Sequence, residues 1–498
     1  MPRSIRSVAV LVMICVIVRS ALAQDQAVFR VVFDPQVRSE AYSGRVYVAF
    51  MRSDRVEPRT RMNAWFNPPP LLAVDVIDIQ PGGSVLIGAS ALSHPVPLDE
   101  IEPGAWRVQA VARVSRDSPR PGTGPGDLYS DVLTVDLGDG RDQPIELVLN
   151  STVQPRAFPE SETVRLFEIT SERLSAFHGR SIAMHAGVVL PDGWAENPDK
   201  RYPIVYQIPG FGGSHFGALG MERSRVPGSD ASKCINVVLD ATCYRGHSVF
   251  ADSANNGPWG SALVEELIPA LEREFRGPLD ARYRFVTGGS SGGWASLWLQ
   301  VAYPDAFGAC FSHVPDPVDF SDFQRIDLYT PGTNLFVDEH EERRPLARRG
   351  ERVILWYDSF VARETVLGPG GQISSFEACF SPRGDDGEPL PVFDRDTGQI
   401  DAQVGRAWEK YDIRLVLQRN WEQLEPSLAG KIHVYAGEVD TYYLEGATRL
   451  LKATLDRLGA DAEIEIIDGM AHQRYPPWEA LMYQTLLARW ERAQAGGD

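Results

Sequence analysis

The stretch Thr287-Gly288-Gly289-Ser290-Ser291-Gly292-Gly293-Trp294 decides the fold of this chain. It follows Tyr283-Arg284-Phe285-Val286, which is typical of a buried strand, and it opens an apolar helical run from Ala295 to Ala302. A glycine-flanked serine between a strand and a helix is the context that a G-x-S-x-G nucleophile elbow requires. The turn is tight, so we expect side chains at positions 288 and 292 to collide with backbone and the serine to be strained.

The motif can be placed in two ways, with either Ser290 or Ser291 as its central serine. The segment resembles the G-H-S-M-G-G elbow of a group of esterases that includes esterase D, the feruloyl esterases and the mycolyltransferases. This resemblance implies that Ser290 is the nucleophile and that Ser291 follows it. The alternative for the motif taken alone is a glycine-rich turn without chemistry.

Length and charge limit the classes of protein that fit. The chain has 498 residues, with 49 Lys and Arg against 67 Asp and Glu, a formal net charge of −18. This length exceeds one compact domain of usual size, so we expect at least two domains. The acidic balance argues against a nucleic acid partner and against binding to anionic membrane surfaces.

The first 23 residues are typical of a cleavable export signal. Arg3 and Arg6 precede the apolar run 8–18, and Ala21-Leu22-Ala23 precedes Gln24. The apolar run is too short to span a bilayer comfortably. We therefore expect cleavage after Ala23 and a secreted or periplasmic protein without stable membrane insertion.

Residues 25–150 alternate short strand-like runs with turns rich in glycine and proline, without a helical period of useful length. This pattern predicts an all-β, immunoglobulin-like sandwich. Its expected strands are 28–33, 44–50, 73–79, 84–88, 106–114, 132–137 and 145–149. Residues 151–163, which contain Pro155 and Pro159, are interpreted as a linker.

From residue 164 to 498 strands alternate with helices, which predicts a mostly parallel sheet covered on both faces. Eight strands are expected, the number in an α/β-hydrolase sheet: 164–169, 182–190, 203–208, 235–240, 284–288, 308–314, 431–436 and 462–467. The interval from about 316 to 430 is far longer than a connection between strands requires, so it is an insertion. In an α/β-hydrolase such an insertion usually forms a cap over the active site.

The sequence contains no spacing typical of a metal site. The cysteines beyond the signal fit either free thiols or one disulfide, and they are Cys234, Cys243, Cys310 and Cys379. The D-x-D-x-G pattern at 394–398 could bind calcium, but the glutamate that ends an EF-hand loop is missing. A plain turn is the favoured interpretation of this pattern.

A serine nucleophile needs a histidine base and a carboxylate that orients the histidine. In α/β-hydrolases these residues occur in the order serine, acid, histidine. His472 follows the last expected strand and is the final histidine of the chain, so it is the predicted base. Asp440 and Glu438 both follow the seventh strand; we favour Asp440, which matches the G-x-x-D pattern of the esterases that this chain resembles.

The tetrahedral intermediate needs two backbone N–H donors for its oxyanion. Ser291, the residue after the nucleophile, would supply one. The loop Pro209-Gly210-Phe211-Gly212-Gly213 resembles the H-G-x or D-G-x loop of the family, with proline in place of histidine or aspartate. This alignment implies that Phe211 supplies the second donor, with Gly212 as the alternative.

The resemblance covers most of residues 164–498 and includes Glu266-Leu267-Ile268-Pro269, which is similar to the E-L-I-P helix of these esterases. It implies a serine carboxylic-ester hydrolase that needs no metal or organic cofactor and acts on acetyl or feruloyl esters of polysaccharides. Enterobactin esterases belong to the same wider group, so siderophore or depsipeptide hydrolysis and acyl transfer stay open. A binding protein with a decayed hydrolase fold is the alternative of another class.

Overall fold

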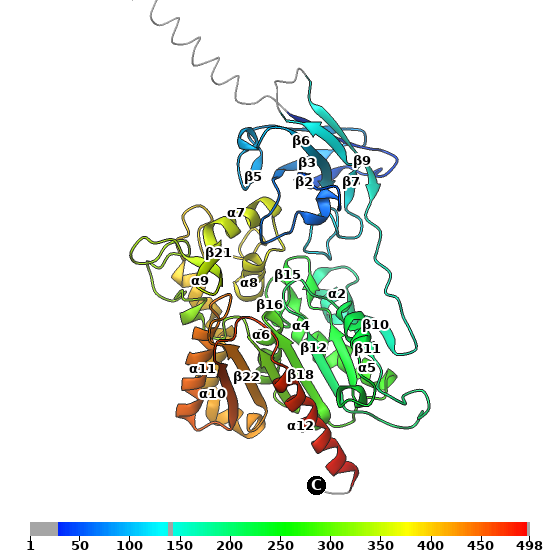
Figure 1. The fold of residues 1–498 in the computed structure, drawn as a ribbon, viewed down its shortest axis with the longest axis vertical. Coiled ribbons are helices and arrows are strands. Elements are labelled where there is room, and N and C mark those ends of the chain that lie inside the picture. The colour runs from blue at the N-terminus through cyan, green and yellow to red at the C-terminus, as the bar shows by residue number, and fades with distance from the viewer. Residues whose placement is uncertain (1–27, 138–142, 496–498) are drawn as a thin grey trace, which may run out of the picture. The chain divides into compact units, whose positions relative to one another are not determined.

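The computed structural model describes residues 28–137 and 143–495, so the export signal expected at residues 1–23 lies outside the described residues (Figure 1). The chain divides into two compact units. The first comprises the chain up to Arg156 together with Ser359–Pro369, and the second comprises Ala157–Asp358 and the chain from Gly370 onward. The interval interpreted as an insertion is therefore divided between the units.

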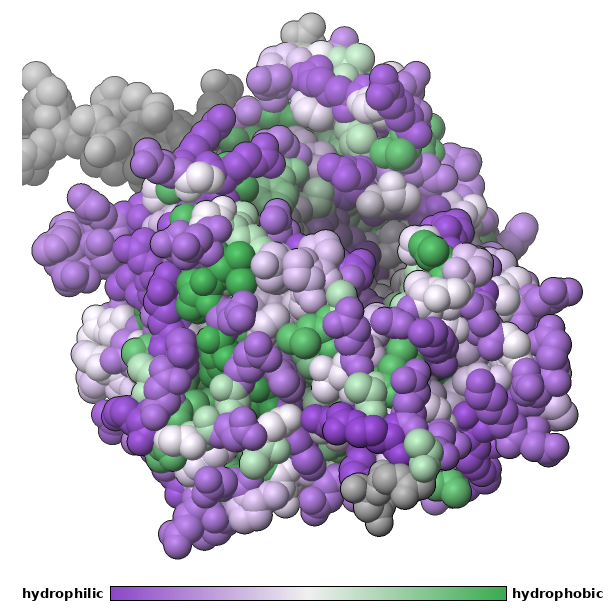
Figure 2. Space-filling model, turned by 60° about the horizontal axis from the view of Figure 1, so that its bottom comes forward, coloured by the Kyte–Doolittle hydropathy of each residue, from purple (hydrophilic) through white to green (hydrophobic). Residues whose placement is uncertain are grey.

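Within residues 28–137 and 143–495, no helix combines the length and the apolar character needed to cross a membrane. Hydrophilic residues cover most of the face drawn in Figure 2, and hydrophobic residues form smaller patches among them.

The first unit contains a nine-stranded sheet, antiparallel except for the pairing of its first and last strands. The strands are β1 (Phe29–Phe33), β2 (Tyr42–Met51), β3 (Leu71–Ile79), β4 (Ser84–Ile87), β5 (Leu92–His94), β6 (Ala105–Ala112), β7 (Leu128–Ser130), β8 (Leu133–Asp136) and β9 (Ile145–Thr152). Their order is β4-β1-β9-β7-β6-β2-β3-β5, and β8 also pairs with β6. The two strands that the sequence analysis missed, β5 and β7, have only three residues each.

The sheet folds over to enclose one hydrophobic core. Phe29 of β1 meets Phe50 of β2 edge to face at 5.7 Å, although these strands are not neighbours in the sheet. Phe50 in turn meets Trp106 of β6 at 6.1 Å. Alternate residues of the strands point into this core, as the period of two requires. The expected all-β domain is confirmed.

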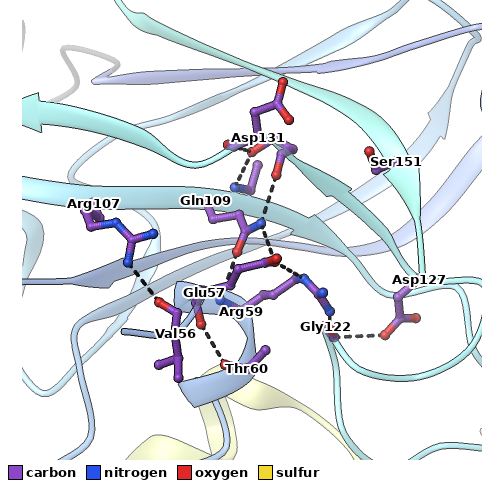
Figure 3. Close-up of polar contacts among 12 residues, drawn as sticks. Val56, Glu57, Arg59, Thr60, Arg107, Gln109, Gly122, Asp127, Asp131 and Ser151 are labelled. Carbon is purple, nitrogen blue, oxygen red and sulfur yellow. Dashed lines mark hydrogen bonds and ion pairs between the residues drawn. The ribbon is translucent and has the colours of Figure 1, made fainter. Parts of the chain in front are cut away.

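A polar network fixes the loop between β6 and β7 (Figure 3). The carboxylate of Glu57 accepts hydrogen bonds from Arg59 and Gln109, at 2.6 and 3.1 Å, beside the 3₁₀ helix η1 (Pro58–Arg61). Arg59 donates to the carbonyl of Gly122 at 2.7 Å, and the N–H of Gly122 donates to buried Asp127 at 2.9 Å. These bonds satisfy the backbone groups that a glycine- and proline-rich loop would otherwise leave unpaired.

Helix α7 (Tyr357–Leu367) places most of its residues in the first unit. The Arg363 guanidinium lies 3.2 Å from Nδ1 of His94 and also donates to the carbonyl of Met62. Tyr47 of β2 donates to the carbonyl of Leu367 at 2.6 Å. This part of the insertion therefore completes the core of the β-domain.

The second unit contains an eight-stranded sheet, as the sequence predicted. Its strands are β10 (Val164–Thr170), β11 (Ala183–Val189), β12 (Ile204–Ile208), β13 (Ile235–Leu239), β18 (Arg284–Gly289), β19 (Ala309–His313), β22 (Ile432–Gly437) and β23 (Ala462–Ile467). Their order is β10-β11-β13-β12-β18-β19-β22-β23. The pairings of β11 are antiparallel and all others are parallel. This is the α/β-hydrolase sheet, and the expected fold is confirmed.

Helices cover both faces of this sheet. Besides α7, the α-helices of the second unit are α2 (Glu172–His178), α3 (Gly217–Arg223), α4 (Trp259–Ala262), α5 (Ile268–Glu274), α6 (Ser291–Ala302), α8 (Gln372–Phe380), α9 (Ala402–Ala407), α10 (Ile413–Leu428), α11 (Glu445–Leu458) and α12 (Pro476–Gln494). Phe311 of β19 packs against Trp478 of α12 at 6.1 Å. The next residue, Ser312, donates to the carbonyl of Gly293 in α6. Because neighbouring side chains of a strand point to opposite faces, α6 and α12 lie on opposite sides of the sheet.

Short elements complete the second unit. They are β14 (Thr242–Cys243), β15 (Gly246–His247), β16 (Asp252–Ser253), β17 (Gly257–Pro258), β20 (Pro345–Arg349), β21 (Arg352–Trp356), and a π-helical segment η4 (Leu263–Leu267) that joins α4 to α5. All four described cysteines are free thiols. In the D-x-D-x-G stretch, Asp394 accepts hydrogen bonds from the N–H groups of Asp396 and Thr397, so this carboxylate closes a tight turn.

The part of the insertion that belongs to the second unit packs on α6 through aromatic residues. Phe380 of α8 lies 4.9 Å from Trp294 of α6, between ring centroids. Phe320 and Trp408 contact Phe380 at 5.2 and 5.3 Å. Both the insertion and the nucleophile helix therefore share one apolar cluster, which fixes the insertion next to the carboxyl ends of the strands.

Candidate active site

Ser290 occupies a strained turn between β18 and α6. Its backbone angles, φ of 59° and ψ of −125°, lie in a region that residues other than glycine rarely adopt. A Cβ atom added at Gly288 would collide with the backbone of Gly292, and one added at Gly292 would collide with the carbonyl of Ile208. The expected steric need for both glycines is confirmed, and the serine side chain lies at the carboxyl edge of the sheet.

His472 and Asp440 are brought together at the same edge. Nδ1 of His472 lies 2.8 Å from Oδ2 of Asp440, whose side chain is fully buried. The N–H of Tyr442 donates to the other oxygen of Asp440 at 2.7 Å. Glu438, the competing carboxylate, is exposed and accepts a hydrogen bond from the N–H of Gly469. Asp440 rather than Glu438 is therefore the carboxylate in contact with His472.

The Ser290 hydroxyl contacts Asp316, a carboxylate that the sequence did not predict as a site residue. Oγ of Ser290 donates to Oδ1 of Asp316 at 3.1 Å, and Oγ of Ser291 donates to Oδ2 at 2.5 Å. Gln372, the first residue of α8, donates to the same Oδ2 at 3.3 Å. Asp316 is 3% exposed, and this burial raises the pKa of its carboxyl group against the opposing effects of Ser291 and the His472 charge.

A sequence signal for Asp316 existed, because it comes shortly after the sixth strand, at the edge where the other site residues emerge. Gln372 had no such signal, since it lies within the long insertion and reaches the site only through the tertiary packing of α8. The structure thus places Asp316 and Gln372 in contact with the elbow serines, and it pairs the expected residues His472 and Asp440 with each other at the same edge of the sheet.

The loop after β12 lies against the elbow. It is closed by a hydrogen bond from the N–H of Gly213 to the carbonyl of Gly210 at 2.9 Å. A Cβ atom on Gly210 would lie 3.3 Å from Cβ of Ser290, so the backbone that precedes Phe211 runs directly beside the serine. The Ser291 N–H belongs to the first turn of α6, where backbone donors have no partner within the helix.

His247 holds the proline that replaces the usual first residue of this loop. Its Nε2 lies 2.9 Å from the carbonyl oxygen of Pro209, and its Nδ1 accepts the N–H of Val249 at 3.1 Å. Nε2 therefore carries the proton and donates it to Pro209. Burial lowers the pKa of His247 to about 4, which keeps the ring neutral.

A second histidine–aspartate pair lies at another strand. Nδ1 of His215 is 2.6 Å from Oδ2 of Asp240, and the imidazole stacks on Phe158 at 5.7 Å. Within the described residues no serine hydroxyl forms a hydrogen bond with this pair, so it provides a structural comparison for the His472 pair.

A cavity of about 440 Å³ lies on the α12 face of the sheet, behind the elbow. Gln207, Thr287 and His313 line it at the ends of three adjacent strands. Thr287 donates to the carbonyl of Phe311 at 2.7 Å, so its oxygen accepts from Nε2 of His313 at 3.0 Å. Burial lowers the pKa of His313 to about 3, with the Arg474 charge acting in the same direction.

Among solved structures, the chain is similar to a ferulic acid esterase with 15% identity and a TM-score of 0.40, over 65% of this chain and 97% of that chain. It is also similar to an S-formylglutathione hydrolase from Agrobacterium tumefaciens, with 15% identity and a TM-score of 0.39, over 66% and 95% of the two chains. The fluorophosphonate-binding serine hydrolase F of Staphylococcus aureus gives 13% identity and a TM-score of 0.38, over 65% and 96%. No curated protein sequence matches the chain.

The family described as Putative esterase matches residues 181–445, which is more than half of the chain. The matched residues include the elbow, the loop after β12 and Asp440. His472 lies beyond the match, on the loop after the last strand of the same sheet. The chain belongs to the Putative esterase family.

Proposed function

We propose that this chain is an exported serine carboxylic-ester hydrolase in which Ser290, His472 and Asp440 form a catalytic triad. The observation that carries the proposal is the 2.8 Å hydrogen bond between His472 and fully buried Asp440, at the same sheet edge as the strained Ser290. A buried carboxylate on Nδ1 fixes the tautomer that leaves Nε2 free to accept the serine proton.

In the proposed reaction, the Ser290 hydroxyl turns to Nε2 of His472 and gives up its proton as Oγ bonds to the ester carbonyl carbon. The N–H groups of Phe211 and Ser291 donate to the oxyanion that forms. His472 then gives its proton to the departing alcohol oxygen, which leaves an acyl-enzyme on Ser290. Water, deprotonated by His472, hydrolyses this ester and restores the serine.

Acetyl or feruloyl esters of polysaccharides are the proposed substrates, because an exported enzyme of this family would meet them outside the cell. Siderophore or depsipeptide esters and acyl transfer to an alcohol are the competing reactions. Turnover of acetylated xylan, methyl ferulate and a catecholate trilactone under identical conditions ranks these substrates, and added alcohol that captures the acyl group reveals transfer.

The test uses the purified chain with p-nitrophenyl acetate. We expect the parent to turn over this ester and Ser290→Ala to be inactive. His215→Gln, which alters the His215–Asp240 pair, is the control and should keep an activity within a few-fold of the parent. Equal activity of the parent and Ser290→Ala would refute the esterase and favour a hydrolase-fold binding protein.

A further inference from the structure

The hydroxyl of Ser290 has one proton, and in this structure that proton is donated to Asp316. The proposed reaction requires the same proton to be donated to Nε2 of His472. Both acceptors cannot receive it at once. When the serine turns to His472, Oδ1 of Asp316 therefore loses its hydrogen-bond donor.

Asp316 cannot follow the serine or reach bulk water. Its other oxygen accepts from Ser291 at 2.5 Å and from Gln372 at 3.3 Å, and its N–H donates to the carbonyl of Ser290 at 3.1 Å. The residue is 3% exposed. A buried carboxylate oxygen without a donor is costly, so the reactive arrangement favours any substrate that supplies one.

Oδ1 of Asp316 lies close to the reacting atoms, so a substrate group near the ester can donate to it. Oδ1 lies 3.1 Å from Ser290 Oγ, the atom that bonds to the scissile carbonyl carbon. A group two to four bonds from that carbon can therefore reach Oδ1 and donate to it at about 2.8 Å. Such a group is either a substituent on the acyl α-carbon or a hydroxyl on the carbon next to the esterified one.

We propose that Asp316, held by Ser291 and Gln372, forms a subsite that accepts a hydrogen bond from a hydroxyl or amine beside the scissile ester. The substrates are then esters that carry such a donor, such as α-hydroxyacyl or α-aminoacyl esters, or esters of vicinal diols as in sugars. The proposal rests on the proposed esterase function and adds the chemistry that the site selects.

Pairs of substrates that differ by one hydroxyl test this subsite. Methyl lactate against methyl isobutyrate places the hydroxyl on the acyl side, and 2-hydroxyethyl propanoate against propyl propanoate places it on the alcohol side. Methyl alaninate replaces the acyl hydroxyl with an amine. We expect kcat/KM of the parent to favour the donor-bearing member of at least one pair by about tenfold or more, because the alternative leaves a buried acceptor unpaired.

The variants assign this preference to Asp316. In Asp316→Asn, whose neutral amide is a weaker acceptor of similar shape, we expect the ratio within that pair to fall several-fold, and in Asp316→Ala we expect it to approach one. If Asp316→Ala does not fold, Asp316→Asn alone decides. Asp396→Asn, an exposed carboxylate in a turn of the insertion, is the control and should keep the ratio of the parent.

Equal rates within every pair for an active parent would overturn the subsite and leave the esterase intact. A preference that persists unchanged in Asp316→Asn would overturn the subsite in the same way. If the parent hydrolyses none of these esters and also fails with p-nitrophenyl acetate, the subsite and the esterase fall together.

Discussion

Nδ1 of His472 lies 2.8 Å from Oδ2 of Asp440, while Glu438, two residues earlier in the chain, is exposed. We expect Asp440→Asn to lower kcat by about 10⁴, because the amide would favour the wrong tautomer of the imidazole. Glu438→Gln should stay within a few-fold of the parent. Steady-state kinetics of the two variants on p-nitrophenyl acetate compare them directly, and a larger loss in Glu438→Gln would exchange the roles of the two carboxylates.

The glycine at position 292 is required by the close approach of the carbonyl of Ile208. We expect Gly292→Ala to destabilise the fold by about 1–3 kcal/mol, since the turn cannot move without moving β12. Gly220 in α3 is the matched control because a Cβ atom there meets no neighbouring atom within 4 Å. Gly220→Ala should be neutral or stabilise by up to about 1 kcal/mol. Urea unfolding of the three proteins checks this difference, and equal stabilities would contradict it.

Buried neutral histidines predict a loss of stability in acid. Burial lowers the pKa of His94 to about 4 and that of His313 to about 3. The unfolded chain binds these protons near pH 6.5 and the folded chain does not, so stability is full above pH 6.5 and falls as the pH drops toward those values.

One variant tests whether His94 contributes to this pH dependence of stability. His94 accepts from Arg363 and lies 3.2 Å from the carbonyl of Ser359, so His94→Gln keeps a donor without a titrating group. The free energy of unfolding should fall less steeply in His94→Gln than in the parent between pH 6.5 and 4. Parallel curves would show that His94 does not titrate as described.

Asp316 should make the stability of the fold depend on pH in the opposite direction to the buried histidines. Burial raises the pKa of its carboxyl group, so the folded chain retains a proton that the unfolded chain has released. Its contribution to stability is therefore lost as the pH rises from about 3.9 through the raised pKa. Asp316→Asn lacks this loss, so its stability relative to the parent should increase from pH 4 to pH 7 in thermal unfolding. A difference that shrinks over this range would contradict the raised pKa.

The sequence was sufficient for the main sheet of the second unit because its strands are long, apolar runs separated by helices. It was insufficient for β5 and β7, where three residues cannot display a period of two. The elbow was predictable because its glycines and its serine form one contiguous motif between a strand and a helix, whereas the partners of Ser290 depend on tertiary packing.

The placement of the insertion could also not be predicted from the sequence. Its length marked it as an insertion, but the sequence did not predict that Ser359–Pro369 would join the β-domain, because an apolar helix face does not specify its partner. Gln372 lies only a few residues later and contacts Asp316 instead. Long-range contacts of this kind decide how the elbow is surrounded.

The identity of the nucleophile tests the central claim most directly. The parent, Ser290→Ala and Ser291→Ala are treated with an organophosphonate that bonds to activated serines, and the modified peptide is identified by mass spectrometry. We expect one adduct per chain, on Ser290, in the parent and in Ser291→Ala, and none in Ser290→Ala. An adduct on Ser291, or equal labelling of Ser290→Ala and the parent, would contradict the proposed triad.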